Sequence, residues 1–380
     1  AMDFSLTEQQ QILGRSAREF LEAECSTAVV REAEESEQGY VPELWRKMAD
    51  LGWFGICLPE AYGGIGGSLT DQVVLFEEIG RALVPGPLLV SSVLAAQIVL
   101  NAGNDAQKQS LLPGIANGGL IFTVARGERL ETASFDTGLN LSGESAFVPY
   151  AEVANHIICA TRPAVGAWPD TTLVIVDPSA GGIFKTRMES IANFPQCLVE
   201  FEDISLTADA VLGDIAEGRP TLDAAIQRAT VVQCAETLGR AQKVLDLVVA
   251  YASVRIQFGR PIGTFQAVQH RCADLKVAID SSRMLTYQAA WRLDQGLPSE
   301  DEVSMAKAQS GTLSRTATEA GHSIFAGISF TIEHDMQLYS ARAKISEANL
   351  GDTEYHLDRI SIGIDLPCLL YTSPSPRDRG

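Results

Sequence analysis

The sequence predicts an α+β protein with a helical N-terminal domain, a central antiparallel β-domain and a C-terminal four-helix bundle. Three observations lead to this fold class. Apolar residues first recur at helical spacing, then gather in short β-rich runs separated by Gly, Pro and Asp, and finally return to helical spacing. The changes between these patterns place the predicted domains at residues 2–117, 118–216 and 217–366.

The composition is that of a globular protein rather than a membrane or nucleic-acid-binding one. Hydrophobic residues make up 46% of the 380 residues and charged ones 20%. The longest apolar stretch, residues 88–100, is interrupted by polar residues and too short to cross a bilayer, so we expect no membrane association. The formal net charge of −19 argues against nucleic acid, because neutralising phosphates requires clustered Lys and Arg. A local Arg cluster can still bind an anionic cofactor.

The N-terminal domain is predicted to begin with an amphipathic helix. Thr7 and Gln10 have the spacing of a capping box. The apolar residues that follow the helical period are Phe4, Leu6, Ile12, Leu13, Ala17, Phe20 and Leu21. The glycine-rich residues 63–67 do not follow a predicted strand, as a phosphate-binding loop would, so we interpret them as a tight connection between helices.

The central and C-terminal domains follow from two further patterns. The β-rich runs are residues 121–124, 145–148, 156–160, 172–176 and 197–201. Helical periodicity resumes near Pro220 and continues to about Gly363. One apolar stripe of the long helix that starts there consists of Leu238, Ala241, Leu245, Val248, Val249 and Ala252.

The cysteines and histidines show no metal-binding pattern. The seven cysteines include no CxxC pair and lie mostly in apolar or helical surroundings, which is typical of reduced core residues in a cytoplasmic protein. The five histidines form neither HxxxH nor HExxH, so no metal site is predicted.

The end of the chain differs from the helix before it. Residues from Cys368 to Asp378 are polar and Pro-rich and resemble the translated end of a sequencing adaptor. We therefore predict that residues 367–380 are a non-native tail and exclude them from the fold. A natural disordered tail is the alternative.

Residues 255–266 follow the long helix and suit a large anionic cofactor. Arg255 offers a planar fork of donors for a pyrophosphate. Phe258 and Phe265 present flat apolar faces, and Gln266 brings both a donor and an acceptor. Pro261 is expected to end the preceding helix. Taken alone, these residues slightly favour an ordinary helix–loop–helix corner.

Three blocks together resemble the acyl-CoA dehydrogenase family, whose members use FAD to desaturate acyl-CoA thioesters. Residues 255–274 look like its flavin-binding signature. Residues 51–64 and 75–83 are similar to its "LPEEYGG…EELGRA" block, and residues 330–339 to its "GGxGFTxEHDLHLY" segment. The blocks span almost the whole chain in the family's order, so the resemblance implies the same helical, β, helical architecture.

The resemblance implies a cofactor, a substrate and an electron acceptor. The cofactor is FAD, the substrate an acyl-CoA, and the acceptor an electron-transfer flavoprotein. The residues that the resemblance places in the FAD site are Arg255, Gln257, Phe258, Ile262, Gln266 and Gly327.

Two FAD-binding segments of the family are altered in this chain. In the "QxHGGxGF" segment, where backbone amides approach the FAD pyrophosphate across a subunit boundary, only Gly327 remains, and larger residues replace glycines at Ala326 and Ser329. The "TEPxxGSD" segment is replaced by residues 123–131, with neither the Pro nor the Gly-Ser-Asp. We therefore expect an altered cofactor pocket, or one completed by another polypeptide.

The catalytic base of the family is also missing from its usual positions. Desaturation needs a base for the α-proton and an acceptor for the β-hydride. The family's base is a Glu at one of two places, which match Leu350 and, with Arg228 matched to the family's helical Arg, Ala229. Leu350 and Ala229 can do no proton chemistry. This match leads us to place Arg228 in the catalytic site.

Glu236 is the first candidate for a replacement base. It lies seven residues beyond Ala229, on nearly the same helical face and roughly 10 Å along the axis. The surrounding apolar run is expected to desolvate the carboxylate partly, which favours base strength. The alternative is a structural Glu bonded to a neighbouring helix end or to an Arg. Asp352, flanked by polar residues that indicate a solvated turn, is the second candidate.

The leading hypothesis is a FAD-dependent acyl-CoA dehydrogenase subunit acting on a bulky or polycyclic acyl group. Such altered signatures are similar to acyl-CoA dehydrogenases of bacterial sterol and bile-acid side-chain breakdown. Several of these are α2β2 assemblies in which two homologous chains share each active site and only one carries the base. A homotetramer, a non-catalytic partner subunit, and a flavin oxidase or monooxygenase of the same superfamily are the alternatives.

Overall fold

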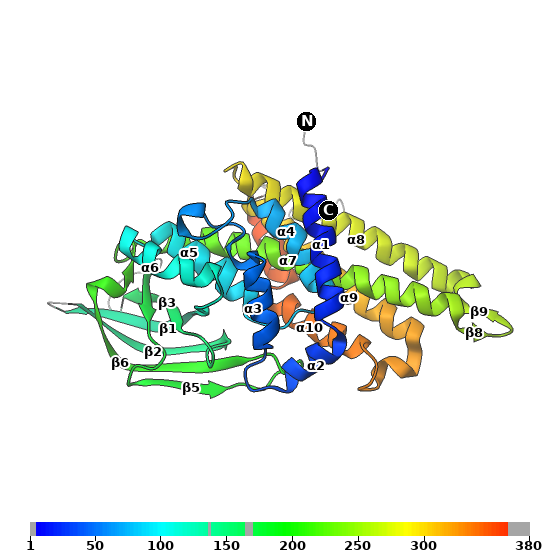
Figure 1. The fold of residues 1–380 in the computed structure, drawn as a ribbon, viewed down its shortest axis with the longest axis horizontal. Helices are drawn as coiled ribbons and strands as arrows, with labels where there is room; N and C mark the ends of the chain where they lie inside the picture. Colours follow the sequence, from blue (N-terminus) through cyan, green and yellow to red (C-terminus); the bar gives the residue numbers. More distant parts are fainter. Residues whose placement is uncertain (1–4, 136–137, 164–169, 364–380) are drawn as a thin grey trace, which may run out of the picture.

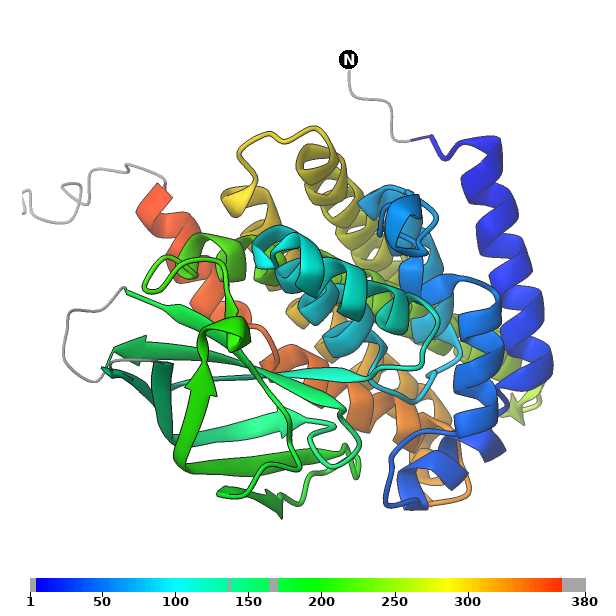
Figure 2. The ribbon, with the colours of Figure 1, turned by 60° about the vertical axis from the view of Figure 1, so that its left-hand side comes forward.

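A computed structural model describes residues 5–135, 138–163 and 170–363, and it confirms the predicted fold class. The sheet lies at one side of the molecule and the long C-terminal helices extend to the opposite end (Figures 1 and 2). The predicted tail, residues 367–380, lies outside the described residues. None of the helices in the described ranges combines the length and apolar character that a membrane crossing requires.

The N-terminal domain is helical, as predicted. Its main helices are α1 (Glu8–Glu24), α2 (Thr27–Glu35), α3 (Pro42–Asp50), α4 (Leu69–Arg81), the π-helical η3 (Leu89–Ala95), α5 (Ala96–Ala102) and α6 (Asp105–Ala116). The capping box is confirmed, because the Thr7 hydroxyl accepts from the Gln10 amide at 3.2 Å and the Gln10 side chain accepts from the Thr7 amide at 3.0 Å. Ala17 and Leu21 are buried, whereas Ile12 is exposed.

The central domain is a seven-stranded sheet with the order β5-β6-β2-β1-β3-β4-β7. Its strands are β1 (Phe122–Phe135), β2 (Gly138–Pro149), β3 (His156–Pro163), β4 (Thr172–Val176), β5 (Ile183–Arg187), β6 (Gln196–Thr207) and β7 (Val211–Leu212). The pairing of β1 with β3 is parallel, whereas the other strand pairs of this sheet are antiparallel, so the predicted antiparallel domain is confirmed with this one exception. The edge strand β5 was missed because most of its residues are polar and exposed.

The C-terminal domain packs helices α7 (Arg219–Val254), α8 (Gln266–Asp294), α9 (Glu300–Phe325), α10 (Met336–Ala348) and α11 (Thr353–Gly363). Five members of the predicted stripe on α7 are buried, but Val249 is 46% exposed and faces away from the core. The expectation that Pro261 ends this helix was wrong. The helix ends at Val254, and Pro261 lies in a short hairpin of β8 (Ile256–Gln257) and β9 (Arg260–Pro261).

Helix α7 crosses α4 at two glycines, and this crossing sets the position of the central helix. A Cβ atom on Gly80 would overlap the carbonyl oxygen of Glu236, and one on Gly239 would overlap that of Glu77. The two backbones therefore approach more closely than any side chain allows. The crossing determines which face of α7 turns toward the sheet.

We predict that Gly239→Ala destabilises the protein by about 3 kcal/mol, because the added methyl group forces the two helix backbones apart. Chemical denaturation of the two proteins measures the difference. Gly181→Ala is the control, since a Cβ there meets nothing within 4 Å. Equal losses of stability in the two variants would show that the crossing tolerates side chains.

Candidate active site

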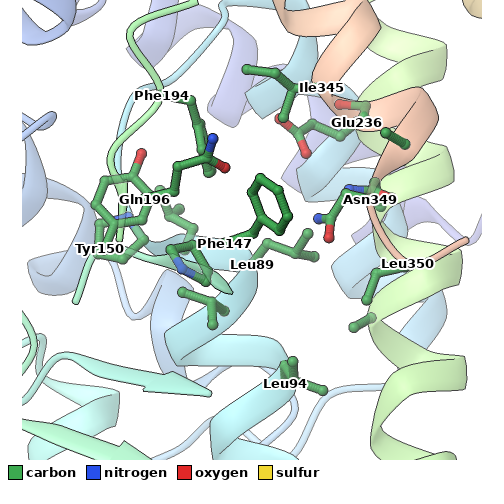
Figure 3. A pocket seen from close by; sticks show the side chains of 18 of the residues that line it. Leu89, Leu94, Phe147, Tyr150, Phe194, Gln196, Glu236, Ile345, Asn349 and Leu350 are labelled. Atoms are coloured by element: carbon green, nitrogen blue, oxygen red, sulfur yellow. The ribbon is translucent and has the colours of Figure 1, made fainter. Parts of the chain in front are cut away.

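A cavity of about 670 Å³ lies where the three domains meet. Its walls come from α4 and the segment after it, η3, β1, β2, the segment before β6, α7, and the end of α10. Figure 3 shows Glu236, Ile345 and Asn349 on one side of this cavity and Tyr150, Phe194 and Gln196 on the other. Most of the lining is apolar, which suits an organic ligand.

One face of α7 supplies the centre of this cavity. Ala229, Gln233, Glu236 and Arg240, which follow each other at helical spacing, all line it. Leu350, which follows α10, lines the same cavity. The structure thus brings together both positions where a base is missing and the proposed replacement, although they come from segments far apart in the chain.

Glu236 is an ion-pair partner of a buried arginine as well as a cavity residue. Arg240 Nη1 donates to the Glu236 carboxylate at 2.9 Å, and Arg240 Nη2 donates to the hydroxyls of Thr237 and Ser346. The Glu236 side chain is 19% exposed and that of Arg240 only 5%. Burial lowers the pKa of Arg240, and the Glu236 carboxylate opposes this. The surroundings of Glu236 are therefore charged as well as apolar.

The other two residues considered for catalysis lie elsewhere. Asp352 is exposed and accepts a hydrogen bond from the Tyr355 amide at 2.8 Å, at the start of α11. Arg228 does not line this cavity, because it projects toward Cys57 in the N-terminal domain. Burial raises the pKa of the Cys57 thiol to about 12, and the charge of Arg228 opposes this. The catalytic role of Arg228 stays a prediction without support from this arrangement.

Phe147 projects into the middle of the cavity from an irregular part of β2 (Figure 3). The register between β2 and β6 shifts between Ser145 and Val148, and Phe147 has a φ of 58°. An irregularity of this kind re-aims a side chain, and such features are frequent beside functional sites. The sequence did not predict this role of Phe147, because the composition of a strand does not indicate where a bulge will fall.

A second cavity of about 440 Å³ adjoins the first. It lies between the sheet and the C-terminal domain, with walls from β1, β3, α7, α9 and α11. Arg126, Leu350 and Gly351 line both cavities, so the two spaces meet at these residues. Gln227, Ser304 and Tyr355 are among the polar residues that the second cavity presents.

The turn at Leu350, which lies between the two cavities, is stabilised by hydrogen bonds from His356 and Lys307. Leu350 has a φ of 59°, and its carbonyl accepts a hydrogen bond from His356 Nε2 at 3.0 Å. Buried Lys307 donates to the carbonyl of Ser346 at 2.5 Å, near the end of α10. Burial lowers the pKa of Lys307 to about 8. These bonds fix the wall that carries Leu350.

The residues predicted to bind FAD lie at the opposite end of the helical domain. Arg255, Gln257, Phe258 and Gln266 are exposed on or beside the β8–β9 hairpin, and Phe258 is 93% exposed. Ile262 is half-buried beneath the hairpin, and its amide donates to the Arg255 carbonyl at 2.8 Å. Figure 1 shows this hairpin far from the sheet. None of these residues lines either cavity.

Gly327 lies at the same end of the bundle as the hairpin. Tyr251 near the end of α7 and Phe325 at the end of α9 have ring centroids 4.9 Å apart, so the two helix ends are adjacent. Gly327 follows in η6 (Ala326–Phe330), where it is exposed. The structure therefore groups the predicted FAD-binding residues with one another, although not with the cavities.

The residues that replace the family's glycines in η6 are accommodated in two different ways. Ser329 is fully buried, and its hydroxyl donates to the Ala326 carbonyl at 2.7 Å and contacts His322 Nδ1 at 2.9 Å. Ala326 has φ 57° and ψ −141°, a conformation adopted almost only by glycine. At this turn, Ala326 adopts a backbone conformation that normally requires glycine.

The comparisons with known proteins identify the family. A family model described as "Acyl-CoA dehydrogenase, N-terminal domain" matches residues 7–119, and one described as "Acyl-CoA dehydrogenase, C-terminal domain" matches residues 216–364. This chain belongs to the acyl-CoA dehydrogenase family. It is 31% identical to the acyl-CoA dehydrogenase IpdE2 of Mycolicibacterium smegmatis, over 93% of this chain and 98% of that protein.

Two solved structures share the whole architecture. One is the ChsE4–ChsE5 complex from Mycobacterium tuberculosis, with a TM-score of 0.89, 28% identity, and coverage of 98% of this chain and 100% of the matched chain. The other, Tcur3481–Tcur3483, is described as a steroid ACAD variant. It has a TM-score of 0.85 and 28% identity, over 93% of this chain and 97% of that one.

Membership of this family makes FAD the cofactor. The second cavity fits the flavin ring system, since its volume lies in the usual range of cofactor pockets and polar side chains line it. The second cavity meets the first one, as is required for a reaction in which the cofactor and the substrate are in contact. The chemistry of the exposed Arg255 and Phe258 suits the anionic and aromatic parts of FAD.

We predict that Ala326→Gly stabilises the protein by about 1 kcal/mol, because glycine adopts the observed φ and ψ without strain. Thermal or chemical denaturation tests this. Ala224→Gly, at an exposed position inside α7, is the control and should destabilise by about 1 kcal/mol. The two substitutions should thus change the free energy of unfolding in opposite directions. A loss of stability in Ala326→Gly would contradict the strain at this turn.

Proposed function

We propose that this chain is a subunit of a FAD-dependent acyl-CoA dehydrogenase and that Glu236 is its catalytic base. The observation that carries the proposal is that the Glu236 carboxylate lines the same cavity as Ala229 and Leu350, the two positions that lack the family's base. A carboxylate from the same face of α7 would reach a substrate in this cavity.

Different residues of the chain have different roles in the proposed reaction. Glu236 removes the α-proton of the acyl group, and Arg240 holds the carboxylate in place through the 2.9 Å hydrogen bond. The apolar walls exclude water and orient the acyl chain. Gln227, Ser304 and Tyr355 would hold the flavin ring system in the second cavity. FAD, when bound, supplies the hydride acceptor for the β-carbon.

The positions of the FAD-binding residues favour an assembly of several chains. Thr230 lines the second cavity, and Arg255 follows 25 residues later at the end of the same helix. At roughly 1.5 Å per residue this separation is about 37 Å, which exceeds the length of a FAD molecule. The hairpin of one chain would therefore contact a FAD whose flavin lies in another chain.

Two findings support a heteromeric assembly and a bulky substrate. The ChsE4–ChsE5 and Tcur3481–Tcur3483 structures are each described by two chain names, and the second is called a steroid enzyme. The first cavity, at about 670 Å³, has room for a large acyl group. We propose a sterol-type acyl-CoA, with a homotetramer as the alternative assembly and an electron-transfer flavoprotein as the electron acceptor.

A non-catalytic partner subunit is the second candidate function. The observation that favours it is the ion pair of Glu236 with Arg240, which gives this carboxylate a structural use. Such a subunit would complete the FAD site of its partner through the exposed Arg255 and Phe258. The cysteines among the described residues are free, which supports a reducing location such as the cytoplasm for either candidate.

We predict that Glu236→Gln lowers turnover by about 10²–10⁴-fold, because the amide cannot accept the α-proton. Gln can still bond to Arg240, so the fold and acyl-CoA binding should persist. Turnover is measured with an electron-accepting dye, and binding by the change in flavin absorbance. Asp352→Asn is the control and should leave turnover unchanged. Unchanged turnover in Glu236→Gln would assign this chain the partner role.

We also predict that this chain retains little FAD alone and binds it stoichiometrically when co-expressed with a homologous chain encoded nearby. The physical reason is that another chain must complete the FAD site, and that Ala326 and Ser329 replace the family's glycines in this chain's own pyrophosphate segment. Flavin absorbance per mole of purified protein measures this. Arg255→Ala should lower the FAD content of the assembly, while Arg46→Ala, at another exposed arginine, should not. A yellow homotetramer with full FAD content would contradict the heteromeric proposal.

A further inference from the structure

Arg126 lines both cavities, and none of the acidic side chains that the structure describes pairs with it. It lies on β1, at a position where the family segment "TEPxxGSD" is replaced in this chain. The first and second cavities share only Arg126, Leu350 and Gly351 among the residues that line them. Of these three, only Arg126 carries a charge.

The backbone of Arg126 is held firmly. Its amide donates to the Ser145 hydroxyl at 3.1 Å, and its carbonyl accepts from the same hydroxyl at 2.9 Å. On the other side it pairs with Ala160 of β3, and the register of that pairing shifts directly after Arg126. The strand therefore positions the start of this side chain in a fixed place at the junction of the cavities.

The other charged residues around the first cavity are already paired. Arg240 bonds to Glu236, Arg342 to Glu34 at 3.2 Å, and Lys344 to Glu347 at 3.1 Å. Around the second cavity, Arg219 pairs with Asp223, and the exposed Arg359 donates to the Tyr355 hydroxyl at 3.2 Å. Among the side chains that the structure describes, no carboxylate lies within ion-pair distance of Arg126.

Arg126 is partly buried, and a cation that is withdrawn from water without a counter-ion lowers stability. Burial lowers the pKa of Arg126, and the Tyr355 hydroxyl across the second cavity opposes this. A buried cation is normally retained where an anion balances it. Because none of the described side chains supplies that anion, we take a bound ligand to be its source.

We propose that Arg126 selects an acyl-CoA whose acyl group carries a carboxylate. The planar guanidinium matches a carboxylate with two parallel hydrogen bonds. The position of Arg126 beside Leu350 places this carboxylate near the reacting carbons rather than at the distant end of the cavity. This inference rests on the proposed function, because it names the substrate class of the same cavity.

The test compares pairs of CoA esters that differ only in a terminal carboxylate. Succinyl-CoA is paired with butyryl-CoA, glutaryl-CoA with pentanoyl-CoA, and adipoyl-CoA with hexanoyl-CoA. Binding to the FAD-loaded full-length protein, together with its partner chain if one is required, is measured by calorimetry. We expect the carboxylate ester to bind about 10- to 100-fold more tightly in at least one pair. The pair with the largest preference locates the carboxylate relative to the thioester.

The variants separate this role from a structural one. Arg126→Gln should abolish the preference and leave the affinity for the monocarboxylic ester unchanged. Arg126→Lys should retain part of the preference, because it keeps the charge but not the planar fork. Arg129→Gln is the matched control, since this exposed arginine on the same strand pairs with Glu144 and lines neither cavity.

Three results would overturn the inference. The first is equal affinity within every pair for the unaltered protein. The second is a preference that survives in Arg126→Gln. The third is a loss of FAD affinity in Arg126→Gln with an unchanged preference, which would assign the guanidinium to the cofactor. A protein that binds none of the six CoA esters would instead contradict the proposed function itself, and the inference with it.

Discussion

The close crossing of α4 and α7 is the constraint on which the candidate site depends. Gly80 and Gly239 let the two helix backbones touch, with the carbonyls of Glu77 and Glu236 lying where side chains would otherwise be. Successive residues of a helix point about 100° apart, so this contact fixes the rotation of α7 about its axis. As a result, the face with Glu236 and Arg240 turns toward the cavity, while the backbone of Glu236 contacts α4.

Charge pairing explains how an apolar cavity can hold several ionised groups. The pair Glu236–Arg240 spans one helical turn, and Arg342 reaches Glu34 in the N-terminal domain, so each buried charge meets an opposite one. Lys307 instead uses the carbonyls at the end of α10, where the helix dipole favours a cation. Against this background an arginine without a carboxylate stands out, and the arrangement points to a ligand that brings the missing negative charge.

The candidate site was predictable to the extent that it depends on helical spacing. The seven-residue interval between Ala229 and Glu236 placed both on one face, and they do line one cavity. The same rule could have found Arg240 four residues further on, as the partner of Glu236. The roles of Phe147 and Arg126 could not be predicted from the sequence, because their orientation depends on shifts of strand register that hydrophobic periodicity does not show. The exposure of Phe258 was equally unpredictable, since a turn sequence does not show whether other segments cover its aromatic side chain.

The sequence by itself determined the class of fold, the position of the first helix cap and the buried stripe of α7, because these features arise from interactions between residues close together in the chain. Only the tertiary structure decided what those buried faces meet. The parallel pairing of β1 with β3, the meeting of Leu350 with Ala229, and the junction of two cavities at Arg126 all join segments that are distant in sequence. Alternating or helical periodicity states which side of an element is buried, but packing and charge compensation between elements determine which residue lies opposite.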